Sequence, residues 1–506
     1  MSLLERAGTV HARRVAVVDG EASYSFAEWR ARSRRLATAL RQAGLQKGDR
    51  VAFLALNSEP LLLAHFGVLQ AGGVLVAINT RLNAQEVAYI AAHSGSRMIF
   101  HSPELGGQLT GVPAAVERIE LGHEFERFLT TGSPGPVESW LEDEYEICAI
   151  DYTSGTTGQP KGVMYHHRGA YLNAVAMGLE NRLRAESVFL WTLPMFHCNG
   201  WSHTWAVPGA GARSVCLPRV DPPLVWRLLD SEGVTHFNAA PTVLIMLASD
   251  PAAHRLTRRV RVCTGGAPPS PTLISQMDGF NVELVHLYGL TECYGPFTIN
   301  LPPPGFEALD AVARAAFKAR QGVPHALAGT VRVVDDQQVD VPADGATMGE
   351  VVLRGNTTMM GYFKDAEATE AAFEGGWFHT GDVGVMHSDG SIELRDRKKD
   401  VIISGGENVS TIEVEQAVMS HPAVMEAAVI AIPDQKWGEV AKAFVTLKTG
   451  CSASAEDIIE HVRGRIAHFK APRVVEFGEL PKTSTGKIQK YLLREKEWEG
   501  RWTRIS

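Results

Sequence analysis

The sequence predicts an α/β fold: a large N-terminal domain of doubly wound sheets, a β-rich subdomain within it, and a small α+β domain at the C-terminus. Short apolar runs alternate with amphipathic stretches through about the first 390 of the 506 residues, a pattern typical of parallel sheets covered by helices. Closely spaced strands with Asp, Gly and Pro turns follow, and beyond residue 400 a separate α+β pattern begins. A chain of this length predicts two to four domains.

A helix is expected after Tyr24 to Phe26, with Trp29, Leu36 and Leu40 on one face and Gly44 as its stop. The tract from Leu61 to Ile78 is strongly apolar, but it contains His65, Gln70 and three glycines. It is too interrupted for a membrane span, so we expect a buried helix followed by a strand. The other buried strands expected in this half are Val51–Leu56, Val74–Ile78, Arg97–Phe100, Ile147–Tyr152, Val188–Leu193 and Val234–Phe237.

The β-rich subdomain is expected at 329–395, where Ser388 to Gly390 forms the turn of a hairpin. The charged segment from Arg395 to Asp400 indicates a boundary. The expected domains are 1–396 and 401–506, with a hinge at 397–400 between them. In the second domain we expect helices at Ile412–Met419 and Ala455–Ile466, and strands at Val424–Ile432 and Ala441–Leu447.

Composition excludes several function classes. The formal net charge is −8, and no basic stretch carries interleaved aromatics, so a nucleic-acid surface is not expected. The N-terminus lacks the apolar core of a signal peptide, and no integral membrane association is expected. The six cysteines form no CxxC pair, which is typical of a reduced, cytoplasmic protein. A homodimer is left open.

A phosphate-binding loop is expected directly after the strand Ile147–Tyr152. It combines glycines that permit a tight backbone with hydroxyl donors and a cation. A plain Gly/Ser/Thr surface loop is the alternative, and the spacing is not that of a P-loop NTPase. The residues expected to contact phosphate are Thr153, Ser154, Gly155, Thr156, Thr157, Gly158 and Lys161.

The segment Thr153–Gly162 resembles the signature of the adenylate-forming superfamily: acyl-CoA synthetases, peptide-synthetase adenylation domains and firefly-type luciferases. The segment Tyr288–Glu292 fits the same family. A Glu in an anion-binding site needs a cation beside it, and Mg²⁺ bridging phosphates is the usual one. The resemblance implies that Glu292 helps to hold Mg²⁺, that Thr291 bonds a phosphate, and that Tyr288 stacks on adenine.

The resemblance also identifies the rest of the nucleotide site. Asp382 and Arg397 are implied to bind the ribose, although TGD is by itself a common turn sequence. The segment Thr264–Pro268 is implied to contact adenosine on one side and the acyl group on the other. The further residues expected to line this site are Gly265, Gly266, Ala267, His286 and Leu287.

The C-terminal motif Pro481–Ile488 resembles the family's terminal motif, which implies that Lys487 contacts the substrate carboxylate and the α-phosphate. A carboxylic acid is already ionised at pH 7, so the chemistry needs cations rather than a general base. The family rotates its small domain between two half-reactions, and Lys399 aligns with the pivot. Gly405 and Gly406 are then implied to line the pantetheine tunnel. Trp437 lies near the CoA nucleotide on this reading, with a core-capping Trp as an equal alternative.

The acyl pocket is expected around Pro194–Trp201, where His197 takes the place of the family's aromatic gate or substrate-contacting His. The HCNGW form resembles that of bacterial medium-chain and methylthio-propionate ligases and plant short-chain or aromatic acid ligases. The pocket residues carry no charge, which favours a short or medium, largely apolar acid. The residues expected to line it are Asn199, Gly200, Trp201, Gly289 and Pro296.

These expectations together predict an acid–CoA ligase. ATP and a carboxylic acid would give an acyl-adenylate and pyrophosphate, and the acyl group would then pass to coenzyme A with release of AMP. The cofactors expected are ATP, Mg²⁺ and coenzyme A. The alternatives are an acyl-adenylate ligase for a carrier protein, an adenylating oxygenase, and a nucleotide-binding scaffold without turnover.

Overall fold

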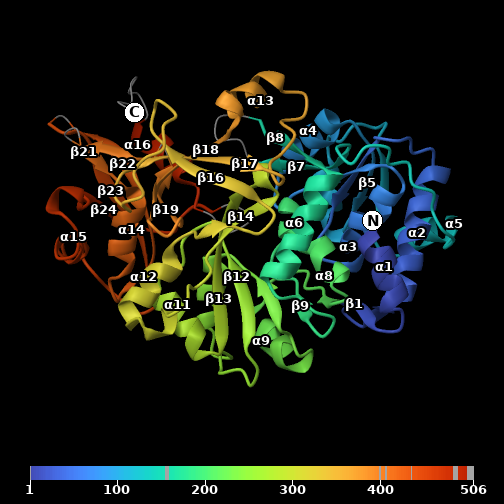
Figure 1. Cartoon of the computed structure of the whole chain (residues 1–506), viewed down its shortest axis with the longest axis horizontal. Coiled ribbons are helices and arrows are strands. Elements are labelled where there is room, and N and C mark those ends of the chain that lie inside the picture. Colours follow the sequence, from blue (N-terminus) through green and yellow to red (C-terminus); the bar gives the residue numbers. More distant parts are fainter. Residues whose placement is uncertain are drawn as a thin grey trace.

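The computed structural model describes residues 2–153, 159–397, 400–404, 407–434, 436–482 and 488–498. Figure 1 shows an elongated molecule, with the N-terminal elements at one end and the C-terminal elements at the other. Two large sheets and a smaller antiparallel sheet make up the N-terminal part, and a further sheet with three helices makes up the C-terminal part. The fold is therefore the α/β arrangement that the sequence predicts.

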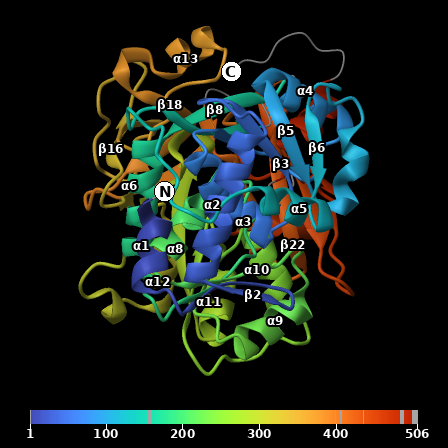
Figure 2. The same ribbon diagram turned by 90° about the vertical axis from the view of Figure 1, so that its right-hand side faces the viewer.

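The first sheet has six strands in the order β6-β5-β3-β4-β7-β8, parallel except for the antiparallel pair β7–β8. Neighbouring residues of β3 point to opposite faces. Phe53 packs into one buried cluster with α2, α3 and α5, and Leu54 packs into another with α4. Figure 2 views the molecule from the side of α2, α3 and α5. The elements are β3 (Arg50–Leu54), β4 (Val74–Ala77), β5 (Ser96–His101), β6 (Glu117–Glu120), β7 (Ile147–Thr153), β8 (Lys161–His166), α2 (Phe26–Gln42), α3 (Glu59–Gln70), α4 (Ala84–Ser94), η1 (Pro103–Leu109) and α5 (His123–Thr131).

The second sheet has nine strands in the order β15-β14-β13-β12-β11-β9-β10-β1-β2. Its central strands are parallel, and antiparallel strands lie at both edges. Helices α9, α10 and α11 cover one face through a cluster that includes Trp226 and Phe237. The elements are β1 (Val15–Asp19), β2 (Ala22–Ser25), β9 (Val188–Leu190), β10 (Arg213–Val215), β11 (His236–Asn238), β12 (Val260–Thr264), β13 (Val282–Leu290), β14 (Gly295–Ile299), β15 (Val323–Pro324), α1 (Ser2–Val10), α6 (His167–Glu180), α7 (Cys198–Trp201), α8 (His203–Gly209), α9 (Pro222–Ser231), α10 (Pro241–Ala248), α11 (Pro271–Gly279), η2 (Thr291–Cys293), η3 (Phe306–Ala308) and α12 (Ala311–Ala319).

The expected β-rich subdomain forms a four-stranded antiparallel sheet, β16-β17-β18-β19. The predicted hairpin is present, since Met386 pairs with Ile392 across the turn and Gly390 has a positive φ. The elements are β16 (Gly329–Val334), β17 (Gly349–Gly355), β18 (Phe378–Met386), β19 (Ile392–Arg397), α13 (Ala366–Ala372) and η4 (Glu374–Gly376).

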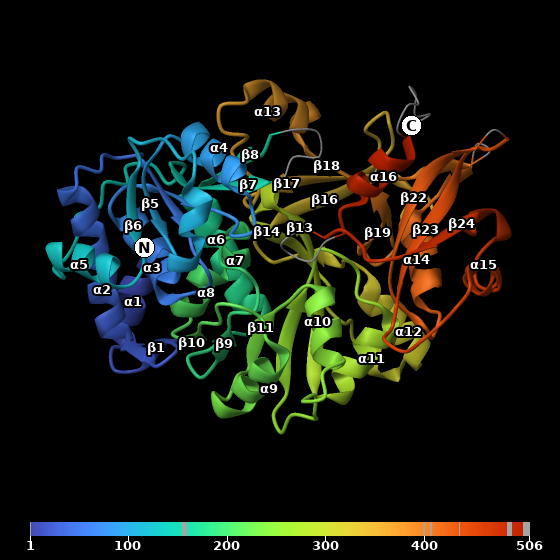
Figure 3. The same cartoon turned by 180° about the vertical axis from the view of Figure 1, so that it is seen from behind.

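The C-terminal elements form a sheet in the order β21-β20-β23-β22, with β24 paired to β23, as seen from behind in Figure 3. Helix α15 ends at Arg463, three residues before the expected end, because Gly464 caps it. The elements are β20 (Ile402–Ser404), β21 (Glu407–Val409), α14 (Thr411–Met419), β22 (Val424–Asp434), β23 (Gly438–Leu447), α15 (Ala455–Arg463), η5 (His468–Lys470), β24 (Val474–Phe477) and α16 (Lys490–Trp498).

Local sequence signals explain how the early helices begin and end. Ser25 and Glu28 form a reciprocal capping box at the start of α2, and Trp29, Leu36 and Leu40 are fully buried on one face. Helix α3 is buried nearly all round and leads into β4, as expected for the apolar tract. None of the helices in the described ranges is long and apolar enough to cross a membrane.

Candidate active site

Side chains from two strands contact the buried carboxylate of Asp382, which lies on a third strand. Asp382 on β18 is only 4% exposed. Its Oδ2 accepts a hydrogen bond of 2.8 Å from the Tyr288 hydroxyl on β13, and its Oδ1 lies 2.7 Å from Nε of Arg397 on β19. The register of the β18–β19 hairpin pairs residues 382 and 397 directly. The structure therefore brings together the three residues assigned to adenine and ribose.

The electrostatics of this group fix its protonation. Burial, with the nearby Asp382 charge, raises the pKa of Tyr288 well above the ordinary phenol value, so the hydroxyl stays a donor. The Asp382 carboxylate raises the pKa of Arg397, opposing the effect of burial. The carboxylate has further lone pairs beyond these two contacts, and they can accept the hydroxyls of a sugar.

A second group joins Glu292 to Lys161 through Tyr362. The Tyr362 hydroxyl donates to Glu292 Oε1 at 2.9 Å. Lys161 Nζ lies 4.9 Å from the centre of the Tyr362 ring and 3.7 Å from Asp365 Oδ2. The residues expected to meet metal and phosphate are thus held by one aromatic side chain that sequence reasoning missed. No motif signals it, because residues 360–363 reach β8 only in the folded chain, where Phe363 N–H donates to Gly162 O at 2.7 Å.

Thr291 is held between β8 and the acyl segment. Its carbonyl accepts a hydrogen bond of 2.6 Å from the Tyr165 hydroxyl, and its Oγ1 lies 3.5 Å from Cys198 Sγ. Burial raises the pKa of the thiols of Cys198 and Cys293, so both stay protonated at neutral pH. A lining role for these thiols fits this better than a nucleophilic one.

The residues expected at the acyl pocket gather around Trp201. A Cβ added to Gly265 would lie 3.3 Å from Cη2 of the indole, and one added to Gly295 would lie 3.0 Å from its Cδ1. The indole therefore lies across both glycines, with no room for a side chain at either. Gly289 lies against the backbone of β14, since a Cβ at this position would lie only 1.8 Å from Gly295 O. Trp201 packs in a buried apolar cluster with Leu193, Cys198, Cys263, Val285, Leu287 and Ile299.

The other expected pocket residues lie on the same elements. Asn199 and Gly200 are buried in α7, His197 is half-buried just before it, and Pro296 is buried in β14. Gly266 and Ala267, which follow β12, are exposed and accessible to a ligand.

Two residues are engaged elsewhere in this conformation. His286 Nδ1 bonds the carbonyls of Ala319 and Arg320, and burial lowers the pKa of this side chain to about 4. Trp437 is 39% exposed, with Lys436 Nζ 4.7 Å from the centre of its ring. Their assignments to the adenosine and CoA sites stay predictions.

Several predicted residues lie outside the described residues. Thr153 is described and pairs with Lys161 across β7–β8, so both ends of the expected phosphate loop lie side by side. Roles for the remaining positions stay predictions: Ser154, Gly155, Thr156, Thr157, Gly158, Lys399, Gly405, Gly406 and Lys487.

The residues that flank the predicted hinge are tied together. Asp396 Oδ1 accepts a hydrogen bond of 3.0 Å from Thr411 Oγ1 at the start of α14. Lys490 Nζ, at the start of α16, donates to the same Thr411 hydroxyl at 2.6 Å and lies 2.7 Å from Glu415 Oε1. The helix that begins three residues after Lys487 is therefore anchored beside the hinge.

The described carboxylates suit a metal that arrives with phosphate. No three His, Cys, Asp or Glu side chains gather into a metal site within the described part of the chain. Mg²⁺ commonly uses one or two protein carboxylates plus substrate phosphates and water, and Glu292 beside Lys161 fits that mode.

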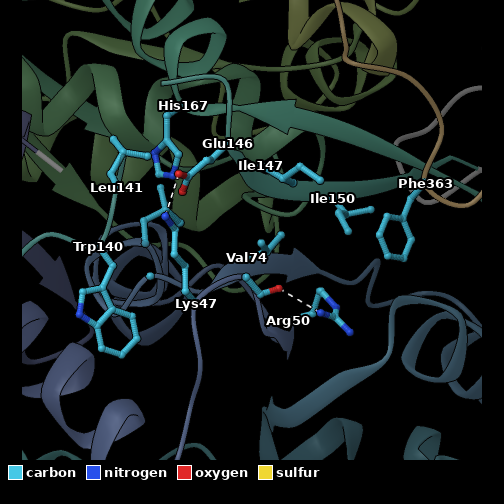
Figure 4. A pocket seen from close by; sticks show the side chains of 13 residues that line it. Lys47, Arg50, Val74, Trp140, Leu141, Glu146, Ile147, Ile150, His167 and Phe363 are labelled. Carbon is cyan, nitrogen blue, oxygen red and sulfur yellow. Dashed lines mark hydrogen bonds and ion pairs between the residues drawn. The ribbon is translucent and has the colours of Figure 1, made fainter. Parts of the chain in front are cut away.

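A cavity of about 400 Å³ between β3, β4 and β7 lies apart from these groups (Figure 4). Its charged side chains already have partners within the chain. Lys47 Nζ lies 2.8 Å from Glu146 Oε1, and Arg50 donates to the carbonyls of Ser94 and Gly95. The cavity therefore adds no unpaired charge that could act on a substrate.

Comparisons with known proteins agree with the site. The family described as AMP-binding enzyme matches residues 4–363, and its C-terminal domain family matches residues 413–487. Among curated relatives, 4-hydroxybutyrate–CoA ligase 2 of Metallosphaera sedula is 42% identical over 97% of this chain and 93% of its own length. The peroxisomal acetate/butyrate–CoA ligase AAE7 of Arabidopsis thaliana is 41% identical over 98% and 94%. The 2-methylpropanoate–CoA ligase CCL4 of Humulus lupulus is 39% identical over 98% and 94%.

Solved structures give the same result. ATP-bound MatB from Rhodopseudomonas palustris superposes with a TM-score of 0.87 at 25% identity, covering 99% of both chains. The anthranilate CoA ligase AuaEII in complex with anthranoyl-AMP superposes with a TM-score of 0.87 at 27% identity, covering 98% of this chain and 96% of that one. This chain therefore belongs to the AMP-binding enzyme family, the adenylate-forming superfamily that its motifs resemble.

Proposed function

We propose that this enzyme activates a short, largely apolar carboxylic acid. The chain is an AMP-forming acid–CoA ligase that uses ATP, Mg²⁺ and coenzyme A. It joins the acid to AMP with release of pyrophosphate and then transfers the acyl group to the CoA thiol. The observation that carries the choice of acid is the indole of Trp201, which lies across Gly265 and Gly295 at the expected acyl site.

The residues divide the work according to charge. The acid is ionised at neutral pH, so the first step brings a carboxylate onto the α-phosphate of ATP. Lys161 and, in our proposal, Lys487 lower the repulsion between these anions. Asp382 and Arg397 hold the ribose, and Glu292 helps to hold Mg²⁺, which when bound neutralises phosphate charge.

The proposed acid follows from the size and polarity of the pocket. In our proposal the bulky indole against two glycines shortens the pocket, and the apolar residues packed with it offer no partner for a second carboxylate. The named substrates of the relatives above are acids of two to four carbons. Medium-chain, methylthio-alkanoic and aromatic acids are the alternatives.

A substrate panel tests this proposal. Pyrophosphate release would be measured with CoA present for acetate, propionate, butyrate, 2-methylpropanoate, 4-hydroxybutyrate, hexanoate, 3-methylthiopropionate and benzoate. We expect the highest kcat/KM among the acids of up to four carbons. In Trp201→Ala the preference should move to hexanoate, since each further buried methylene adds about 0.8 kcal/mol, or about fourfold in kcat/KM. Trp201→Phe serves as the matched intermediate. A wild-type preference for benzoate or hexanoate would contradict the proposal.

The acceptor and the domain motion complete the proposal. AMP formation that depends on added CoA, with no requirement for a carrier protein or oxygen, separates the ligase from its enzymatic alternatives. We further propose a hinge at 397–400 between domains 1–396 and 401–506, with Lys399 as pivot. Lys399→Pro should preserve adenylation and slow thioester formation, because proline fixes φ.

We also propose a cytoplasmic location and leave room for a homodimer. The first is supported by the six described cysteines, which are all free of disulfides in this structure. Light scattering in solution would decide the second, and fractionation of cells would test the location.

A further inference from the structure

The segment expected to form the wall of the acyl pocket, residues 198–202, is wound as a left-handed helical turn. All five residues from Cys198 to Ser202 have positive φ: 49°, 49°, 61°, 54° and 59° in order. Trp201 N–H donates to His197 O at 3.4 Å, and Ser202 N–H donates to Cys198 O at 3.2 Å, so the segment forms one left-handed helical turn. Only Gly200 is a glycine. Such a turn is disfavoured for L-residues and persists only where its surroundings hold it.

Buried polar side chains from neighbouring elements hold this turn. Asn199 Nδ2 donates to Asp151 Oδ2 at 2.7 Å. Thr204 Oγ1 donates to the carbonyl of Asn199 at 2.9 Å, and Asn173 Nδ2 donates to Ser202 Oγ at 2.9 Å. Every one of these side chains is almost fully buried, and Asp151 is 3% exposed. No solvent can replace these hydrogen bonds.

Asp151 links this turn to the nucleotide side of the site. It lies on β7, two residues before Thr153, at the end of the strand that leads to the expected phosphate loop. The turn that it holds carries Trp201 and Cys198, and Cys198 Sγ contacts Thr291 Oγ1 at 3.5 Å. One buried carboxyl group therefore joins the strand of the expected phosphate loop to the wall of the expected acyl pocket.

The surroundings of Asp151 disfavour its charge. Burial raises the pKa of this carboxyl to about 8, against the effect of the Asn199 hydrogen bond, and Oδ1 has no hydrogen-bond partner in the described chain. The titratable groups that face it are themselves uncharged at neutral pH. They are Cys148 on β7, Tyr165 on β8, Cys198 on α7 and Tyr294 before β14, with His65 of α3 beside Asn199. Asp151 thus acts as a neutral hydrogen-bonding group.

We propose that Asp151 is a positioning residue that holds the left-handed turn 198–202 and thereby sets the affinity for the acid during adenylation. The role rests on the proposed function, in which this turn lines the acyl site. Nothing in it requires Asp151 to touch a substrate. The proposed role predicts that a neutral side chain of the same shape at position 151 will still hold the turn, whereas a truncated side chain will not.

Two variants with a control test this role. Asp151→Ala removes the acceptor and should raise the KM for the acid about tenfold or more, with a much smaller change in the KM for ATP. Asp151→Asn keeps an acceptor oxygen and should restore the acid KM to within about threefold of wild type. Ser33→Ala on α2, which removes a buried 2.7 Å hydrogen bond to Gln70 on α3, should leave both KM values unchanged. Equal rises in both KM values for Asp151→Ala, or an unchanged acid KM, would overturn the proposal.

Thermal unfolding supplies a readout that needs no turnover. A buried acid with a raised pKa destabilises the fold increasingly as pH rises from its unfolded value toward its folded value. The melting temperature of Asp151→Asn should therefore rise relative to wild type between about pH 5 and pH 8. A constant difference over that range would overturn the neutral role of Asp151. If the wild-type enzyme turns over no acid of the panel, the proposed function fails. That result differs from the KM and melting results that would overturn the role of Asp151, so the two failures can be told apart.

Discussion

Tyr362→Phe is the sharpest test of how the site holds Glu292, the carboxylate that we propose to face the metal. The hydroxyl of Tyr362 donates to Glu292 Oε1 at 2.9 Å, and the ring lies beside Lys161 Nζ at 4.9 Å. The variant removes the hydrogen bond and keeps the ring. A hydrogen bond to a charged group contributes about 1.5–3 kcal/mol. Because this pair is only partly buried, we take the lower end, which corresponds to about tenfold in kcat/KM for ATP.

Tyr362→Ala separates the second contribution. It removes the ring as well, and a partly exposed cation–π contact contributes about 0.5–1 kcal/mol. We therefore expect a further loss of about two- to fivefold. Both effects act through the Glu292 carboxylate, so Tyr362→Phe should cost little when added to Glu292→Ala, which removes the acceptor; such a result marks the two changes as coupled.

The assay is pyrophosphate release at saturating acid, with ATP varied at several Mg²⁺ concentrations. The control is thioester formation from supplied acyl-adenylate and CoA, which needs no pyrophosphate-bound metal and should run at the wild-type rate. Full kcat/KM for ATP in Tyr362→Phe would refute the reasoning. Equal losses in the two half-reactions would refute it too, since they would indicate general damage to the fold.

Three further predictions concern charge. Asp382→Ala leaves Arg397 without its 2.7 Å partner and should raise the KM for ATP more than tenfold in a pyrophosphate assay; an unchanged KM would contradict the ribose role. Lys487→Ala should lose adenylation and still convert supplied acyl-adenylate to thioester, so equal loss of both reactions would refute a one-step role. His325 has a pKa lowered to about 4 by burial, and its Nδ1 accepts the Leu327 amide. In the unfolded chain this side chain binds a proton near pH 6.5. Neutral His325 therefore contributes its full share to the free energy of unfolding above pH 6.5, and about 3 kcal/mol of that free energy is lost as the pH falls to 4. His325→Asn should flatten acid unfolding measured by circular dichroism, and an unchanged pH dependence would contradict the assignment.

Much of the fold could be predicted because its signals are local. The capping box of Ser25 and Glu28 starts α2 where the sequence indicates, and Ser388–Gly390 turns the chain between β18 and β19. The positions of the site residues follow from the same signals. The apolar runs predict strands that end just before Tyr288 and begin just after Asp382, and the structure extends both strands to include these residues. The motifs predict which side chains carry the chemistry.

The contacts between those residues could not be predicted in the same way. Tyr362 reaches Glu292 across 70 residues, and Asp151 reaches Asn199 across 48, and both contacts form only when the sheets and the segments between them assemble. The left-handed turn at 198–202 is harder still to predict from the sequence, since four of its five residues are not glycine and disfavour that conformation locally.

The sequence alone determined the family, because the motifs expected to bind phosphate, metal and the substrate carboxylate each consist of a few adjacent residues. Only the tertiary structure decided which distant side chains contact Glu292 and hold the turn 198–202. The physical reason is burial: inside the protein, a hydrogen bond from a distant strand has no competing water, so it can fix a backbone conformation that the local sequence disfavours.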